Sequence, residues 1–255
     1  MSDPVRYEVS KGVATITLDA PERRNAFSQD LVKGLLAGLA AAGADEAVRV
    51  VVVTNTGGTF SAGADLKEDR ASLGPDAATF VDVVRVIEAL PKPVVAKVAG
   101  HAAGGGAALA ACCDVAIAVS TARIGITEVR IGVPPHGVAA LLARRMTKRA
   151  LFEAFLVADM MPAARAADLG LINLAVEPQA FDETVARYVD GLIRGGPHSL
   201  AATKRLLLHM DELTPAQAEL LANEASRGAF ERAEAREGVA SFIGKRPAAW
   251  TPADS

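Results

Sequence analysis

Strand-length runs of apolar, β-branched residues alternate with helical segments through the first half of the chain. Residues 48–53 form such a run after a helix predicted from a Ser28 N-cap to about Ala42. A second helix, predicted from Pro75 to about Leu90, precedes the run at 94–98, and residues 114–119 form a third. Repeated strand, loop and helix units favour an α/β fold whose parallel sheet binds ligands at loops beyond the carboxyl ends of its strands.

The two ends of the chain depart from this rhythm. Residues 5–9 and 13–18 alternate apolar with polar side chains around Lys11-Gly12, which predicts a hairpin. After about residue 140 the pattern is mostly helical, so we predict an α/β core over residues 1–195 and a C-terminal helical region over residues 196–255. The later helices are predicted at 138–146, 148–158, 163–168, 181–193 and 214 to about 242, with one strand at 172–176.

Composition excludes several classes of protein. The net charge is −3 without long blocks of either sign, so we expect neither nucleic acid nor a membrane as partner. No apolar run approaches the roughly 20 residues of a membrane span, and the N-terminus lacks the pattern of a signal peptide. The two cysteines, Cys112 and Cys113, are neighbours that are poorly placed to bridge, which favours a cytoplasmic protein.

Two loops carry small residues beside a helix start. Gly104, Gly105 and Gly106 lead into an alanine-rich helical segment, and residues 60–68 read FSAGADLKE. Glycine lets a backbone N–H approach a ligand, and a helix N-terminus presents free N–H groups to it. Two such amides converging on one oxygen would form an oxyanion hole for a thioester enolate. The alternative is that each run is only a tight, closely packed turn.

Taken together, several motifs in order resemble the enoyl-CoA hydratase/isomerase family, the crotonase superfamily. They are PERRNAF (21–27), FSAGADLKE (60–68), KPVVAKVAGHAAGGGAALAACCD (92–114), ITEVRIGVPP (126–135), ARAADLGLIN (164–173) and REGVASFIGKRPAAW (236–250). The resemblance implies a crotonase-like (ClpP/crotonase) fold of repeated ββα units with a C-terminal helical trimerisation region. It also implies an acyl-CoA thioester substrate, no separate cofactor or metal, and a homotrimer or a hexamer built as a dimer of trimers.

By position in the family's motifs, the amides of Ala64 and Gly105 are expected to form the oxyanion hole. Residues implied by the resemblance to bind the substrate or its CoA moiety are Arg23, Arg24, Ala62, Asp65, Leu66, Lys67, Gly104 and Lys245. Lys245 would reach the CoA of a neighbouring subunit. The alternative for the arginines is a solvated basic turn.

One carboxylate remains where the family's typical hydratase has two. The first position is Ala108 here, and the second is Glu128, in a mostly apolar stretch. Glu128 is therefore the expected acid/base. Without the resemblance, the alternative interpretation is a glutamate that points into solvent. His136 falls next to the expected water site, where it could transfer protons or only pack at the rim.

A single base allows two reactions on an enoyl-CoA. The first interpretation is hydration of a 2-enoyl-CoA to a 3-hydroxyacyl-CoA, and the second is isomerisation of a 3-enoyl-CoA to a 2-enoyl-CoA. Loss of the first glutamate favours isomerisation. The amino-acid sequences of the motifs at residues 107–114 and 127–133, in contrast, resemble those of hydratases. A hypothesis of another class is a non-catalytic acyl-CoA-binding protein that kept the CoA site.

Overall fold

A six-stranded sheet forms the centre of the computed structural model, which describes residues 3–69, 74 and 77–252. The hairpin strands β1 and β2 pair antiparallel, as predicted, and the other neighbours are parallel. In sheet order the strands are β1 (Val5–Ser10), β2 (Val13–Leu18), β3 (Val50–Asn55), β5 (Val94–Val98), β7 (Val115–Val119) and β10 (Leu174–Val176).

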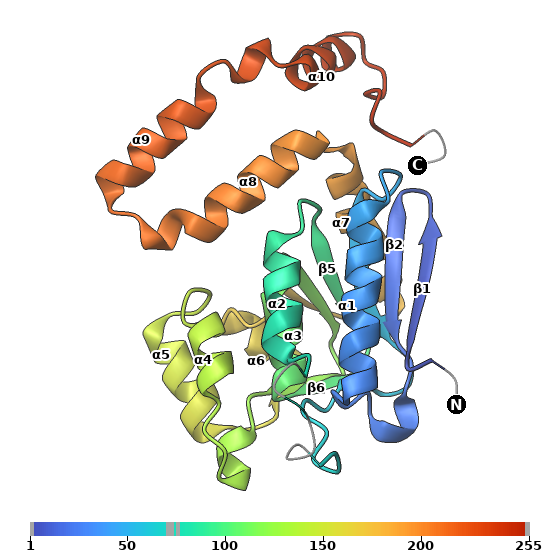
Figure 1. Ribbon diagram of the computed structural model, residues 1–255, viewed down its shortest axis with the longest axis vertical. Coiled ribbons are helices and arrows are strands. Elements are labelled where there is room, and N and C mark those ends of the chain that lie inside the picture. Colours follow the sequence, from blue (N-terminus) through green and yellow to red (C-terminus); the bar gives the residue numbers. More distant parts are fainter. Residues whose placement is uncertain (1–2, 70–73, 75–76, 253–255) are drawn as a thin grey trace.

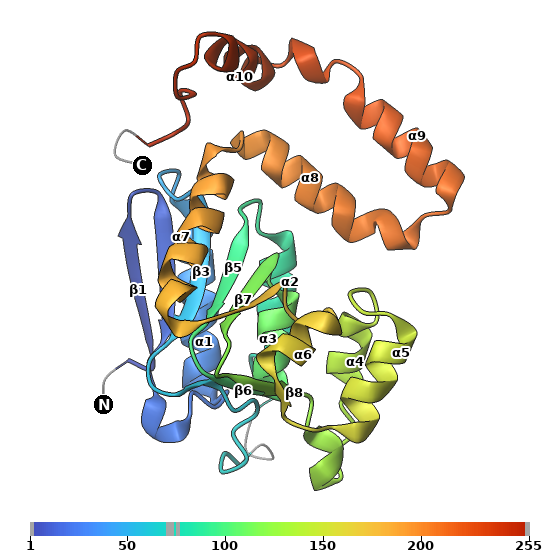
Figure 2. The same cartoon turned by 180° about the vertical axis from the view of Figure 1, so that it is seen from behind.

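Both faces of this sheet are covered, which explains its continuous β-branched runs. Val51 and Val53 of β3 point into the core beneath α1 (Gln29–Ala44) and α2 (Phe80–Ala89), and Val50 and Val52 pack with α7 (Pro178–Arg194). Figure 1 shows α1, α2 and α3 (Gly105–Cys112) on one side of the sheet, and Figure 2 shows α7 on the other.

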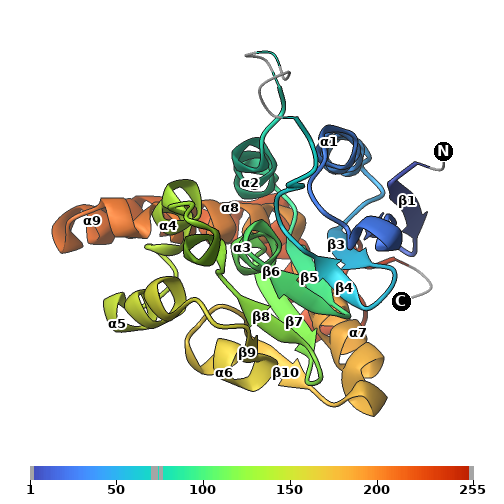
Figure 3. The same cartoon turned by 90° about the horizontal axis from the view of Figure 1, so that it is seen from below.

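A second sheet of short strands lies across one end of the first (Figures 1 and 3). Its order is β4 (Thr59–Ser61), β6 (His101–Ala103), β8 (Arg123–Gly125) and β9 (Met161–Pro162). These strands were not predicted, because two or three residues are too few for a periodic pattern. β4, β6 and β8 follow β3, β5 and β7 along the chain, so each long strand is continued by a short one, and the first two pairs lead on to α2 and α3.

The helices that follow β8 match the prediction in part. α4 spans His136–Leu142, α6 spans Ala163–Asp168 as predicted, and a 3₁₀ turn covers Glu128–Ile131. The single helix predicted at 148–158 is α5 (Lys148–Phe152), continued by a π-helical turn over Glu153–Val157.

Two helix predictions were wrong, and one helix was not predicted. Thr79 and Asp82 form a capping box, so α2 begins at Phe80; Pro75 lies outside the described residues. The helix predicted from 214 to 242 is broken at Gly228, whose φ of 66° is left-handed, into α9 (Pro215–Ser226), a 3₁₀ turn (Ala229–Glu231) and α10 (Ala233–Ile243). The unpredicted helix is α8 (Pro197–His209).

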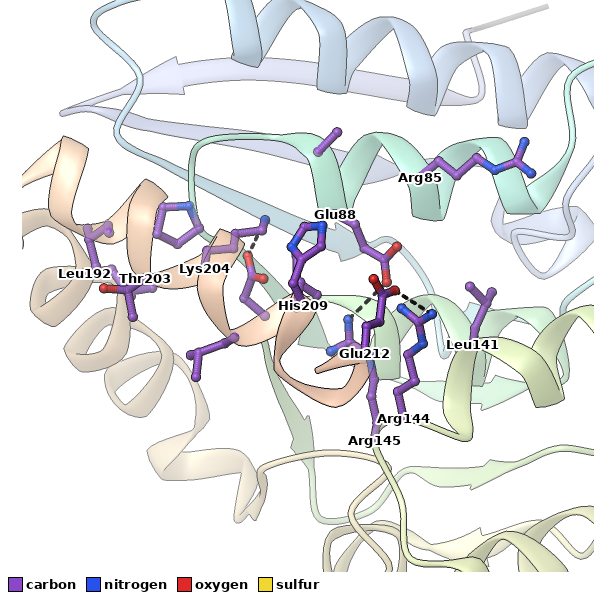
Figure 4. Close-up of a pocket in the computed structure, with 16 residues that line it drawn as sticks. Arg85, Glu88, Leu141, Arg144, Arg145, Leu192, Thr203, Lys204, His209 and Glu212 are labelled. Carbon is purple, nitrogen blue, oxygen red and sulfur yellow. Dashed lines mark hydrogen bonds and ion pairs between the residues drawn. The ribbon is translucent and has the colours of Figure 1, made fainter. Parts of the chain in front are cut away.

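Lys204 ties α8 to the core. Its nearly buried ammonium donates to Asp114 at 2.7 Å and to the carbonyls of Ile87 and Lys92 at 2.7 and 3.2 Å. Beside it, a cavity of about 630 Å³ lies between α2, α4 and α8 (Figure 4). Other charged side chains that line the cavity are also paired, Arg144 with Glu212 and Arg145 with Glu88. We therefore interpret the cavity as a packing gap between the helical layers.

The C-terminal helices extend over the end of the molecule opposite the second sheet (Figures 1 and 2). The boundary between core and helical region at 195/196 stays a prediction, although it falls between α7 and α8. None of the helices in the described ranges is long and apolar enough to span a membrane.

Candidate active site

The two small-residue loops meet through their backbones at the start of α3. A methyl group on Gly63, whose φ is +80°, would lie 2.8 Å from the carbonyl oxygen of Ala103 and 2.9 Å from the amide nitrogen of Gly105. Any side chain at Gly63 would therefore separate the loops. Their parallel strands, β4 and β6, end here side by side, which brings the loops together.

Each glycine of the run 104–106 has a different neighbour. A methyl group on Gly104 would come within 2.9 Å of Oε1 of Glu128, and one on Gly105 within 3.1 Å of the Phe27 ring. One on Gly106 would collide with the carbonyl of Ser61. Residues 104–106 are thus all glycine because a carboxylate, an aromatic ring and a strand approach the same helical turn and leave no room for side chains.

The amides of Ala64 and Gly105 flank this contact. Ala64 follows Gly63 directly, and Gly105 is the first residue of α3, after the N-cap Gly104. Within the described part of the chain, neither amide donates a hydrogen bond to a protein acceptor. The first amides of a helix have no intrahelical partner, which explains the free Gly105 N–H. Ala64 lies on its loop outside any helix, and its N–H also lacks a protein acceptor among the described residues, so both N–H groups are available to a ligand oxygen.

Glu128 brings a desolvated carboxylate to this point. It opens the 3₁₀ turn Glu128–Ile131, and its Oε2 is buried without a hydrogen-bond partner among the described residues. Burial raises the pKa of Glu128 above its ordinary value of 4.5, and the backbone amides of Glu128 and Thr127 offset part of that rise. A partly buried carboxyl group whose pKa is raised in this way is suited to accept and return a proton.

The early turn braces the Ala64 loop. Arg23 forms an ion pair with Asp65, which is 5% exposed, and the other Asp65 oxygen accepts from the Lys67 amide at 2.9 Å. Ala62 donates its amide to the carbonyl of Arg24 at 3.0 Å. Arg23 and Asp65, both expected at the CoA, therefore bind each other here.

The remaining predicted residues differ in exposure. Leu66 and Lys67 are exposed on the loop, Ala62 and Ala64 are partly exposed, and Arg24 has a left-handed φ of 54°. Gly104 is buried beneath Glu128. Lys245 is exposed just after α10, which lies at the opposite end of the molecule from β6 (Figure 1), so it is not part of this site within one chain.

Two further positions concern the chemistry directly. Ala108 is fully buried inside α3 and adds no charge to the site. His136 is exposed at the start of α4, and a methyl group on the neighbouring Gly137 would lie 3.7 Å from the Val81 side chain of α2. The structure therefore brings Ala64, Gly104, Gly105 and Glu128 together, and leaves His136 on the surface.

Neither the two cysteines nor the possible metal ligands of the described residues meet the requirements of a catalytic thiol or a metal site. Cys112 and Cys113 are unpaired and buried, and burial raises the pKa of Cys112 to about 12. Such thiols stay protonated and pack as small apolar groups. No group of three or more His, Cys, Asp or Glu side chains in the described ranges could hold a metal ion.

Comparisons with known proteins identify the family of this chain. A family model described as "Enoyl-CoA hydratase/isomerase" matches residues 8–253. The chain belongs to this family. It is 35% identical over 254 residues to a protein of Rhodobacter capsulatus named "Probable enoyl-CoA hydratase", with 97% of each chain covered. A protein of the same name from Rhizobium meliloti is 32% identical over 244 residues, covering 94% of this chain and 95% of that one.

Solved structures confirm the predicted fold class. The crystal structure of an enoyl-CoA hydratase from Mycobacterium smegmatis superposes with a TM-score of 0.89 at 31% identity, covering 97% of this chain and 98% of that one. The chain therefore has the crotonase fold, with two mixed sheets and C-terminal helices, and is an enoyl-CoA hydratase-like protein.

Asn25 is a site-supporting residue that the sequence analysis did not single out. Its fully buried amide group donates to the carbonyls of Thr59 and Thr56 at 2.7 and 3.1 Å and accepts from the Ala20 amide at 2.8 Å. A signal was present, because asparagine tolerates the left-handed φ of 50° found here. Its acceptors, about 30 residues away, could not be identified from the sequence.

We expect Asn25→Ala to destabilise the protein by about 3 kcal/mol, because it leaves buried backbone groups unpaired in a strained turn. Asn25→Gly should cost less, since glycine adopts positive φ without strain. Urea unfolding of both variants measures the difference, with Asn223→Ala on exposed α9 as the matched control. Equal stability of Asn25→Ala and the control would contradict the bracing role.

Proposed function

We propose that this protein hydrates a 2-enoyl-CoA thioester to a 3-hydroxyacyl-CoA, with Glu128 as the single acid/base. The observation that carries the proposal is the desolvated Glu128 carboxylate held over Gly104, beside the unpaired Gly105 amide. Family membership supports an acyl-CoA substrate, and the two named relatives and the Mycobacterium smegmatis structure carry hydratase names.

In the proposed mechanism the thioester oxygen accepts hydrogen bonds from the amides of Ala64 and Gly105. Glu128 takes a proton from water while the water oxygen bonds to the β-carbon. The C=C electron pair moves toward the thioester, and the enolate oxygen carries the charge, where each amide is worth up to about 3 kcal/mol. Protonated Glu128 then returns its proton to the α-carbon.

Isomerisation of a 3-enoyl-CoA to a 2-enoyl-CoA is the second candidate, and Ala108 favours it. Glu128 would remove a proton from the α-carbon, form a dienolate whose oxygen accepts from the same two amides, and return the proton at the γ-carbon. This reaction needs no second group to hold a water. A third candidate function is not enzymatic: the protein would bind acyl-CoA without converting it.

Binding of the CoA moiety would fall to the exposed part of the Ala64 loop and the early turn. Leu66 and Lys67 are free to contact a ligand, and Arg24 and Ala62 lie where the two segments join. Arg23 and Asp65 would act by holding the loop in place. Cytoplasmic location stays a prediction, and the two unpaired cysteines are consistent with it.

Replacing Glu128 with Gln should lower turnover of a short trans-2-enoyl-CoA by about 10²- to 10⁴-fold, because the amide cannot move the proton. The loss of ultraviolet absorbance of the conjugated thioester measures hydration, and a 3-enoyl-CoA assayed by gain of the same absorbance measures isomerisation. Full activity of Glu128→Gln would show that the base is misassigned. A wild-type protein that binds enoyl-CoAs calorimetrically but converts neither substrate is a binder.

The raised pKa of Glu128 predicts how activity depends on pH. The base must be ionised, so kcat/KM should fall as pH falls through the pKa of Glu128, with its midpoint above 4.5. A carboxyl group whose pKa is raised in the folded state stabilises the protein at low pH, and this contribution is lost as pH rises through that pKa. Glu128→Gln should therefore be the more stable protein at pH 7 by urea unfolding. A midpoint at or below 4.5 would contradict a desolvated base.

We further propose a homotrimer, or a hexamer built from two trimers, assembled through the C-terminal helices. α8 and α9 bury none of their residues and α10 buries only Ser241, while large apolar side chains are exposed there. These are Leu207, Leu220, Leu221, Phe230, Phe242 and Ile243. Exposed apolar surface of this extent marks an interaction surface.

Light scattering after size exclusion should therefore give three or six times the chain mass. Phe242→Asp with Ile243→Asp should reduce that mass, because two charges would be placed in an apolar interface. Lys33→Asp, on an exposed position of α1, is the control. A monomeric wild-type protein would refute the proposed assembly.

A further inference from the structure

Arg130 connects the Glu128 turn to a distant segment of backbone. It lies two residues after Glu128, in the same 3₁₀ turn. Its Nε donates to the carbonyl of Ala158 at 2.8 Å, its Nη2 donates to the carbonyl of Val157 at 3.2 Å, and the guanidinium pairs with Asp159. Among the described residues, every hydrogen bond and ion pair of the Arg130 side chain falls within residues 157–159.

The accepting carbonyls lie at the end of a helix. Val157 is the last residue of the π-helical turn that continues α5, and Ala158 has a left-handed φ of 53°. Terminal carbonyls of a helix have no intrahelical partner and carry a partial negative charge, which a guanidinium satisfies. The pair with Asp159 is half-exposed on both sides and contributes little by itself.

Segment 157–159 is a firm anchor for such a contact. Ala158 is fully buried, and Gly125 packs so closely on the carbonyl of Asp159 that a methyl group there would collide with it. β9 follows two residues later and pairs with β8 at Ile124 and Met161. The segment is thus held by burial and by the second sheet, independently of Arg130.

Glu128 needs a tether of this kind. Its Oε2 has no partner among the described residues, so no hydrogen bond to that oxygen fixes it over Gly104. The turn that carries it exposes Val129 and Ile131, and ends at Gly132 with a φ of 74°. Burial of the turn therefore holds it weakly. Besides the backbone amides of Glu128 and Thr127 at the carboxyl, the guanidinium contacts restrain the turn.

We propose that Arg130 is a positioning residue, whose contacts with the Val157 and Ala158 carbonyls hold the Glu128 carboxylate over Gly104. The inference deepens the proposed function and rests on it, since it assigns how the base of that reaction is placed. The other charged or titratable side chains around the turn and its anchor are Arg123 of β8, Glu153 and Asp159, with His136 at the start of α4.

The test compares Arg130→Met, Arg130→Lys and a control. Methionine keeps much of the length but removes all donors, whereas lysine keeps the charge and one donor group. The control is Arg165→Met, because Arg165 binds Glu153 at 2.8 Å and so braces the same helix without contacting the Glu128 turn. Two readouts are taken: steady-state kinetics, and the Glu128 pKa from carbon-13 NMR of its carboxyl group, assigned with Glu128→Gln.

We expect Arg130→Met to lower kcat by about 10- to 100-fold through misplacement of the base, with KM changed less than about threefold. Arg130→Lys should recover part of the loss, and Arg165→Met should behave like wild type. Release of the turn into water should also lower the Glu128 pKa toward 4.5 in Arg130→Met, moving the acid limb of kcat to lower pH.

Wild-type kcat and an unmoved Glu128 pKa in Arg130→Met would overturn the inference. So would an activity loss that only tracks the folded fraction measured by circular dichroism, with the pH profile unchanged. The NMR comparison needs no turnover, so it decides the positioning role even if the wild-type protein converts no enoyl-CoA. That last result would count against the proposed function alone.

Discussion

The contact between Gly63 and the Ala103–Gly105 backbone is made without side chains, and the site depends on it. Parallel pairing of β4 with β6 brings the loops to one edge, but a Cβ at Gly63 or Gly106 would hold them apart. Only with the loops in contact do the amides of Ala64 and Gly105 flank the same point. The ion pair of Arg23 with Asp65 and the buried Asn25 brace the outer side of this contact.

Glu128 departs from the usual bonding of buried polar atoms. Most buried side-chain polar atoms of the described residues are bonded, as at Asn25 and Lys204, whereas Oε2 of Glu128 and the hydroxyl of Tyr7 have no protein partner. A carboxylate stabilised by a cation or by several donors would be a poor base, because its pKa would be low. The unpaired oxygen therefore lowers stability locally, and we propose that it suits this carboxyl to proton transfer.

The long strands and α6 could be predicted because burial on both sheet faces and helical periodicity leave strong local patterns, as at residues 50–55 and 163–168. The second sheet could not, since its strands are set by neighbours far along the chain. α8 was missed because it buries no residue within this chain. Motif resemblance led us to propose Ala64, Gly105 and Glu128 as site residues, whereas Asn25 and Arg130 bind distant backbone carbonyls that leave no mark in the sequence.

The two proposed parts of the chemistry, enolate stabilisation and proton transfer, would depend on different elements, which a hydrogen bond helps to join. The amides belong to the β4 and β6 loops, whereas Glu128 follows β8 by three residues. The Gly104 amide donates to the carbonyl of Gly125 at 2.8 Å, which fixes the glycine turn to the strand that leads to the base. With Ala108 buried and neutral, the register of β6 on β8 would set the geometry of the single carboxylate in either proposed enoyl-CoA reaction.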